Sequence, residues 1–354
     1  MARKELEFEF GLPVFTKEKR PVKFNHNKIL VSDIWAFWNY IIKEYSSTDT
    51  KKNILLSLLE QSKTFFNVAE QAEMRSKPLL YYYSFLNFAK IAIELHTSFD
   101  IHQRFDHGIN PVIMNNRYNF NTDKVEILKL NSGNNNPTKR SVCYEFMEIV
   151  ESSINHCFPP TLQIGIKELL QQCIGVHRTY TNIYNEQEIF SRIDNLKLYK
   201  DGKFLIFNAE LVDGIKNVNY NNLKTFYNFI EKDSKAILEI KYQMPNYAIT
   251  DKSRYLLSKE IRDKGIWYFI TKDEYKYYIS HTNKPRYSPS FTIYLTMFYL
   301  GSITRYHPYL FDEIFSQSEQ WLISEFLKNQ PTQFLYLTTS KILGAELRVS
   351  YSKL

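Results

Sequence analysis

The chain has 354 residues, of which 44% are hydrophobic and 23% are charged, and it contains three cysteines. This composition excludes an intrinsically disordered chain and a small disulfide-stabilised domain. The formal net charge of +7 is compatible with an acidic partner such as RNA or DNA, although an AT-rich genome would enrich the same Lys, Asn, Ile and Tyr residues.

The first part of the chain, residues 1–185, is predicted to be a helical region. Apolar residues recur at helical spacing in 32–45 and again in 49–74. A third helix, 77–96, is apolar around most of its circumference, which predicts a central position in the fold. Residues 161–184 are predicted to form a fourth helix.

The middle of the chain, residues 186–285, is predicted to be a β-rich module. Two strand-like runs flank Asp201–Gly202, a dipeptide typical of tight hairpin turns. Residues 236–243 have the alternation of a strand, and a second hairpin is predicted to turn near 272–274.

The helical period returns in the last region, residues 286–354. Helices are predicted at 288–306, 318–329 and 331–344, followed by a final strand. We expect these helices to pack on the N-terminal ones. The predicted fold is therefore α+β, a mostly helical body formed by the N- and C-terminal helices with a β-rich insertion.

No apolar run reaches the length of a membrane-spanning helix, and the first residues lack the apolar stretch of a signal peptide. The sequence therefore predicts a soluble, cytoplasmic protein without a membrane partner. The Gly-rich, GxSxG and HExxH motifs of nucleotide, serine-hydrolase and zinc sites are absent, so no cofactor and no metal are expected. Glu239 and Lys241 match half of a metal-dependent nuclease motif, but the same spacing recurs at several other places in the chain.

Arg305 and His307 stand at the end of an apolar helical segment and require an explanation. One interpretation is a simple helix end, in which Arg305 contacts the last carbonyl groups and His307 is forced out of helical geometry by Pro308. However, Pro308 alone is sufficient to end a helix. We therefore hypothesise that the guanidinium and the imidazole serve a functional site.

Other polar side chains in the apolar segments complete a candidate pocket. Lys90 and Arg305 are predicted to bind an anion, and His107 and His307 are the candidates for catalytic acid–base chemistry. Tyr83 and Asn87 share one helix face with Lys90, since they stand at i, i+4 and i+7, and are further predicted binding residues.

Three segments together resemble the YaaC-like family of bacterial proteins: "LLYYYSFLNFAK" (79–90), "DHG" (106–108) and "LGSITRYHPYLFDEIF" (300–315). The resemblance implies a soluble bacterial protein with a helical core, and it transfers no catalytic residue. The expected function is that of a nucleic-acid-associated protein, RNase-like or a defence effector, with RNA or DNA as partner. The alternatives are a non-catalytic module whose β region docks a protein partner, and a sensor of a small anion or nucleotide. Whether the protein is an enzyme stays open at this point, as does its oligomeric state.

Overall fold

The computed structural model describes residues 3–6, 28–96, 105–113, 118–130, 140–151, 159–245, 247–271 and 275–349. Within them the protein has an α+β fold, with eleven α-helices and several mainly antiparallel sheets. The chain divides into two compact units. The helical unit comprises residues 33–187 and 288–338, and the sheet unit comprises residues 1–32, 188–287 and 339–354.

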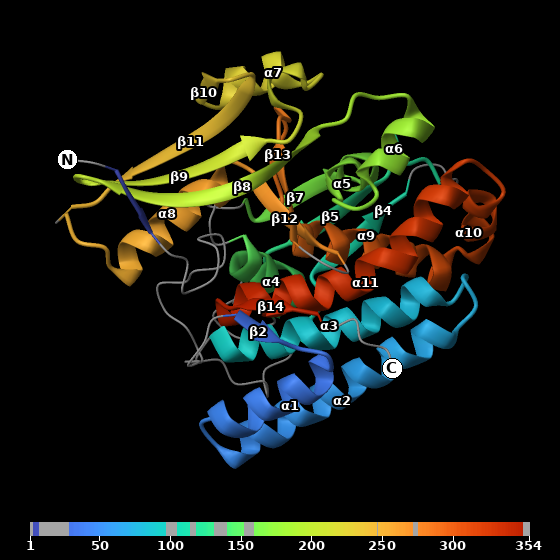
Figure 1. Cartoon of the computed structure of the whole chain (residues 1–354). Coiled ribbons are helices and arrows are strands. Elements are labelled where there is room, and N and C mark those ends of the chain that lie inside the picture. The colour runs from blue at the N-terminus through green and yellow to red at the C-terminus, as the bar shows by residue number, and fades with distance from the viewer. Residues whose placement is uncertain are drawn as a thin grey trace. The chain divides into compact units, whose positions relative to one another are not determined.

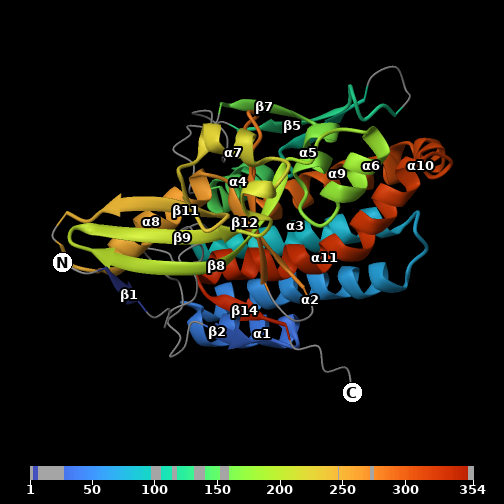
Figure 2. The ribbon, with the colours of Figure 1, turned by 45° about the horizontal axis from the view of Figure 1, so that its top comes forward.

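The helical unit is built around long helices from both ends of the chain. Asp33 caps the first of them by accepting hydrogen bonds from the backbone N–H groups of Trp35 and Ala36. Figure 1 shows α3 between α2 on one side and α9 and α11 on the other, and Figure 2 shows the same helices from another direction. The helices are α1 (Ile34–Tyr45), α2 (Asp49–Gln71), α3 (Lys77–His96), α9 (Pro289–Tyr306), α10 (Pro308–Phe315) and α11 (Glu319–Leu343), the last of which leaves the unit after residue 338.

Helices α3 and α9 pack closely against each other in the core of the helical unit. Both are buried on most sides, as their apolar circumference predicts. Gly301 of α9 makes the close approach possible, because a Cβ atom at this position would lie 3.2 Å from the Pro78 carbonyl oxygen and 3.3 Å from the Tyr82 Cβ. Phe85 of α3 stacks on Phe334 of α11, with ring centroids 3.9 Å apart.

Short strands and helices complete the helical unit. β4, β5 and β7 form an antiparallel sheet, while β3 and β6 pair in parallel. The single helix predicted over 161–184 is wrong. Its first residues pair with β5, and Gly175, with φ of 104°, separates two short helices. The elements are β3 (Phe105–Asp106), β4 (Ile109–Val112), β5 (Lys124–Leu128), β6 (Arg140–Ser141), α4 (Val142–Val150), β7 (Thr161–Gly165), α5 (Ile166–Gln172) and α6 (His177–Tyr184).

The sheet unit contains a seven-stranded antiparallel sheet in the order β10-β11-β9-β8-β13-β12, with β1 paired to β8. The predicted hairpin at Asp201–Gly202 is confirmed as β8–β9. The second predicted hairpin is β12–β13, whose turn at 272–274 lies outside the described residues. The strands are β1 (Lys4–Leu6), β8 (Phe190–Asp201), β9 (Phe204–Leu211), β10 (Phe229–Lys232), β11 (Lys235–Gln243), β12 (Ile266–Ile270) and β13 (Tyr275–Ser280). A separate parallel pair joins β2 (Lys28–Leu30) and β14 (Glu346–Arg348).

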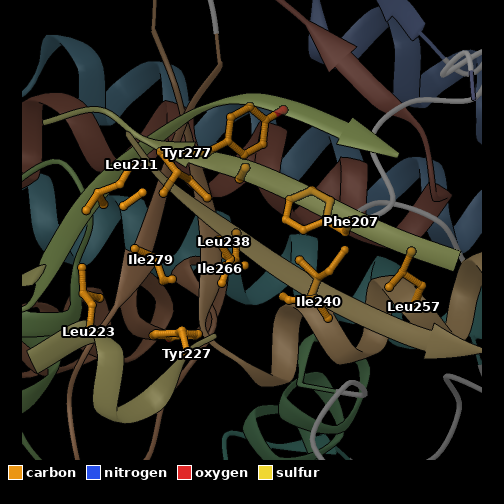
Figure 3. Packing of buried hydrophobic residues seen from close by; sticks show 14 of the residues in the cluster. Phe207, Leu211, Leu223, Tyr227, Leu238, Ile240, Leu257, Ile266, Tyr277 and Ile279 are labelled. Carbon is orange, nitrogen blue, oxygen red and sulfur yellow. The ribbon is translucent and has the colours of Figure 1, made fainter. Parts of the chain in front are cut away.

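One face of the large sheet carries the core of the sheet unit. Alternate residues of β9 and β11 point into it, with Phe207 paired to Ile240 in register. Leu223 of α7 (Tyr220–Phe226) and Leu257 of α8 (Asp251–Asp263) join them (Figure 3). These two helices were not predicted from the sequence.

Helix α11 runs without interruption through Pro331, where the sequence predicted a boundary between two helices. Proline removes one backbone hydrogen bond from a helix and normally breaks it. Here Phe326 and Leu327 before the proline and Phe334 after it are all buried, so packing offsets the lost bond. Among the described helices, none combines the length and the apolarity needed to cross a membrane.

Candidate functional site

Two consecutive tyrosines of α3 each hold a basic side chain. The Tyr82 hydroxyl lies 2.9 Å from Nδ1 of His107. Next to it, the Tyr83 hydroxyl accepts a hydrogen bond of 2.8 Å from Nη1 of Arg305, at the end of α9. The rings of the two tyrosines lie side by side, with centroids 5.9 Å apart. His107 and Arg305, which come from different elements, are thereby held by consecutive residues of α3. We call Lys90, His107 and Arg305, together with Tyr82 and Tyr83, the basic cluster.

The backbone around His107 is fixed by α4. The Cys143 N–H donates to the His107 carbonyl oxygen at 3.1 Å. Gly108 follows with φ of 65°, and a Cβ atom there would collide with the Ser141 side chain. Only glycine fits both the positive φ and this contact, so the "HG" pair serves to place the imidazole.

Lys90 contributes a second positive charge to the cluster, beside that of Arg305. It is half-buried on α3, and no residue of the described part of the chain forms a hydrogen bond or an ion pair with its ammonium group. Burial lowers the pKa of Lys90. A half-buried cation without a carboxylate partner is costly for the fold, and an anionic ligand would compensate it.

The electrostatics of the cluster favour the neutral form of His107. Burial is the main cause that lowers the pKa of His107, and the charges of Lys90 and Arg305 lower that pKa further. The Asp106 carboxylate acts in the opposite direction. It is itself exposed and accepts a hydrogen bond of 3.3 Å from the Gly108 N–H. The cluster thus joins two cations and a neutral imidazole with one nearby acid.

Two of the residues predicted for the site make their observed contacts outside the cluster. Asn87 is buried and donates to Oε1 of Gln61 on α2, at 3.4 Å. His307 ends α9 and begins α10, and its ring lies edge-on to Tyr309. Among the described residues, neither side chain has a hydrogen bond to a member of the cluster. Conversely, Tyr82 was not selected from the sequence, because in an apolar helix it has the pattern of a core residue.

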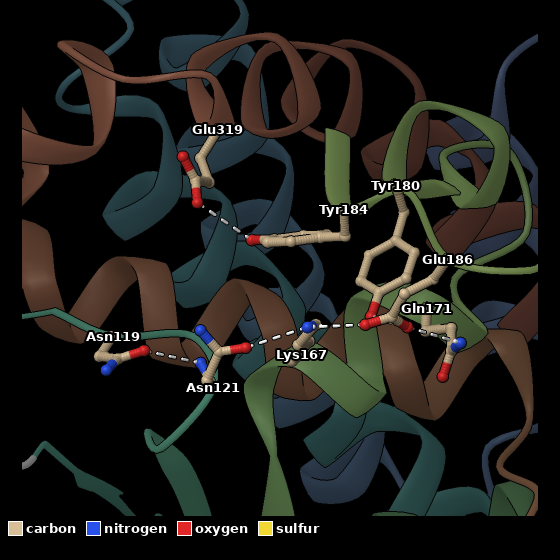
Figure 4. Close-up of polar contacts among 8 residues, drawn as sticks. All are labelled: Asn119, Asn121, Lys167, Gln171, Tyr180, Tyr184, Glu186 and Glu319. Carbon is tan, nitrogen blue, oxygen red and sulfur yellow. Dashed lines mark hydrogen bonds and ion pairs between the residues drawn. The ribbon is translucent and has the colours of Figure 1, made fainter. Parts of the chain in front are cut away.

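A second polar group, absent from the sequence analysis, surrounds Lys167 of α5 (Figure 4). The Lys167 ammonium lies 2.7 Å from Oε1 of Glu186 and donates to Asn121 at 3.0 Å. Glu186 also accepts from Tyr180 and Gln171. These groups satisfy one another, so the network joins α5 and α6 to the loop before β5 and does not offer a site.

The Glu239 carboxylate is likewise engaged within the protein. It forms ion pairs with Arg3, at 2.6 Å, and with Lys241, at 2.8 Å. No group of three or more His, Cys, Asp or Glu side chains in the described residues is arranged to hold a metal ion.

A family model described as YaaC-like protein matches residues 22–342 of the chain. This match spans every member of the basic cluster. No curated protein and no solved structure is significantly similar to the chain. The structural observations above are therefore the basis for assigning a function.

Proposed function

We propose a function from the geometry of the basic cluster, because the chain belongs to the YaaC-like family, whose description names no activity. The basic cluster binds the phosphate groups of nucleic acid. The observation that supports this most directly is the pairing of Tyr82 with His107 and of Tyr83 with Arg305. Two neighbouring hydroxyls fix two basic groups of different elements on the helix that carries Lys90, whose charge acts on His107.

The chemistry of these side chains suits phosphate. A guanidinium offers a planar fork of donors to phosphate oxygens, and a lysine ammonium adds a point charge. A neutral imidazole donates one N–H without a charge of its own. The overall charge of +7 would further favour the approach of a polyanion.

Binding is supported more strongly than cleavage. Neutral His107 could accept a proton from a ribose hydroxyl, as an RNase-like reaction requires. Cleavage also needs an acid that protonates the leaving group. The second predicted catalytic residue, His307, forms no hydrogen bond with the cluster among the described residues, so no observed contact supplies this acid. Incubation of labelled RNA with the wild type and with His107→Gln tests this step, because cleavage by His107 would be lost in the variant.

The binding proposal is tested by fluorescence anisotropy with labelled RNA, with DNA and with a competing mononucleotide. We expect Lys90→Gln and Arg305→Gln to weaken nucleic-acid binding about tenfold or more, and to reduce the slope of log K against log salt by about 0.7–0.9 each. Lys43→Gln removes an exposed lysine from α1 and serves as the control, with affinity close to the wild type.

Two results would overturn the proposal: no binding of RNA or DNA by the wild type, or full affinity in both cluster variants. Tight binding of the mononucleotide alone would instead support the sensor of a small anion. Nucleic-acid binding and sensing of a small anion would both use the basic cluster, and the length of the preferred ligand distinguishes the two functions.

A second candidate function, docking of a protein partner, is favoured by exposed apolar side chains of the sheet unit. They are Val212, Ile215, Val218 and Ile230, of which Val218 is 92% exposed. The short helix Gly214–Lys216, which carries Ile215, lies against the β10–β11 turn, since the Ile215 N–H donates to the Ser234 carbonyl oxygen. Co-purification followed by reconstitution from two purified proteins tests this function, and Val218→Lys should abolish the complex.

A further inference from the structure

Aromatic rings and basic groups alternate at the junction of α9 and α10. Arg305 and Tyr306 end α9, His307 forms the connection, and Tyr309 lies in the first turn of α10. Tyr306 is 60% exposed and Tyr309 is 55% exposed, although both are large enough to contribute to a core. Exposed tyrosines at one junction, next to the basic cluster, indicate a contact surface.

Each ring at this junction lies beside a basic side chain. The Arg305 guanidinium lies over the Tyr306 ring, 4.9 Å from its centroid. The His307 ring meets Tyr309 at an interplanar angle of 83°, with centroids 6.2 Å apart. Arg305 also donates to Tyr83, so the same guanidinium belongs both to the junction and to the basic cluster.

Of the two acidic residues of α10, Asp312 and Glu313, the first is compensated within the protein. The Asp312 carboxylate forms an ion pair of 2.6 Å with Arg75, whose side chain is 73% exposed. The charge of Asp312 is thereby compensated on the protein surface.

We propose that this junction binds single-stranded nucleic acid, with unpaired bases stacked on Tyr306 and Tyr309 and the phosphates between them held by Arg305. Two exposed rings next to a guanidinium supply the stacking surfaces and the phosphate contact that single-strand binding combines. A duplex would hide its base faces and could use only the phosphate contacts. This inference rests on the proposed function and adds the class of nucleic acid that the site prefers.

Affinity for a single strand and for the duplex of the same sequence tests the preference, with RNA and DNA as separate arms. Stacking contributes about 1–3 kcal/mol per base, so each of Tyr306→Ala and Tyr309→Ala should weaken single-strand binding about 5- to 140-fold. Duplex binding should change less than twofold. Tyr306→Phe and Tyr309→Phe keep the ring and should bind as the wild type does.

Tyr40→Ala provides the matched control, since it removes a tyrosine of similar exposure, 51%, from α1 of the same unit. Equal affinity for single strand and duplex, or no effect of the two alanine variants, would overturn the inference while leaving phosphate binding by the cluster intact. Absence of any nucleic-acid binding by the wild type would overturn the proposed function itself. The two failures are therefore distinguishable.

Discussion

At the residue scale, the main feature of the protein is the use of two adjacent tyrosine hydroxyls to orient basic groups. Consecutive residues of a helix point about 100° apart, so Tyr82 and Tyr83 can address different partners from one turn. Tyr82 holds the imidazole of His107, and Tyr83 holds the guanidinium of Arg305. Lys90, two turns further along α3, adds charge without a hydrogen bond to a described residue.

Removing a positive neighbour of His107 and removing its negative neighbour should shift the pKa of His107 in opposite directions. Lys90→Gln removes a positive neighbour and should raise the pKa of His107, whereas Asp106→Asn removes the neighbour that favours the imidazolium and should lower that pKa. The measurement is an NMR titration of the imidazole protons in each variant. If both variants move the pKa in the same direction, or if neither changes it, the described neighbourhood of His107 is wrong.

The sequence predicted part of this site for physical reasons. Lys90 and Arg305 were identifiable because charge is rare in apolar helices, and His107 because an imidazole can exchange a proton near neutral pH. Asn87 shares a face with Lys90 by spacing, but it is turned towards Gln61 of α2. A helical pattern defines the face of a side chain and not its partner, so this contact could not be predicted.

At the element scale, the α3–α9 pair positions the cluster, and Gly301 sets the distance between the two helices. Leucine at this position would have to displace the Pro78 carbonyl and the Tyr82 side chain, because even a Cβ atom would lie 3.2–3.3 Å from them. We expect Gly301→Leu to lower the free energy of unfolding by about 1–3 kcal/mol, as overpacking does. It should also weaken ligand binding, since Tyr82 carries His107.

Urea unfolding of Gly301→Leu gives the stability change, and Thr304→Leu on the same helix is the control. Thr304 is only half-buried and lies in the last turn of α9, where a larger side chain can reach solvent. Equal stability of Gly301→Leu and the wild type would show that α3 and α9 are not in close contact at this point.

Elements were predictable where their own pattern was long and uniform. Helix 77–96 and the helix ending at 306 were predicted because apolar residues cover most of their circumference. The region 161–184 was not, because its strand depends on pairing with β5, which is remote in sequence. The continuity of α11 through Pro331 likewise depends on burial of neighbouring residues, which sequence alone does not reveal.

At the scale of the whole molecule, both units bury tyrosine hydroxyls. In the sheet unit, the Tyr227 hydroxyl contacts the Lys264 and Ser280 carbonyl oxygens. In the helical unit, the Tyr299 hydroxyl donates to the buried Asp123 carboxylate at 2.5 Å. Burial raises the pKa of Tyr227 to about 12, and burial together with Asp123 raises the pKa of Tyr299.

These raised pKa values predict that the protein loses stability in alkali. A tyrosine of the unfolded chain ionises near pH 10, whereas the buried ones keep their protons above that pH. Above about pH 10 the unfolded state therefore binds fewer protons than the folded state, and the free energy of unfolding decreases as pH rises. The contribution of Tyr227 is complete below about pH 10 and is lost as the pH rises through about 12.

Urea unfolding from about pH 8 to about pH 11 checks this expectation, because each raised tyrosine contributes up to about 1.4 kcal/mol per pH unit. Above about pH 10, Tyr227→Phe should reduce the slope of the free energy of unfolding against pH by the equivalent of up to one proton. The loss of its hydroxyl should also lower stability at neutral pH. Tyr247→Phe changes a tyrosine of the same unit that is 63% exposed, and its slope should equal that of the wild type. A free energy of unfolding that stays constant above about pH 10 would mean that the Tyr227 and Tyr299 hydroxyls reach water in the folded protein.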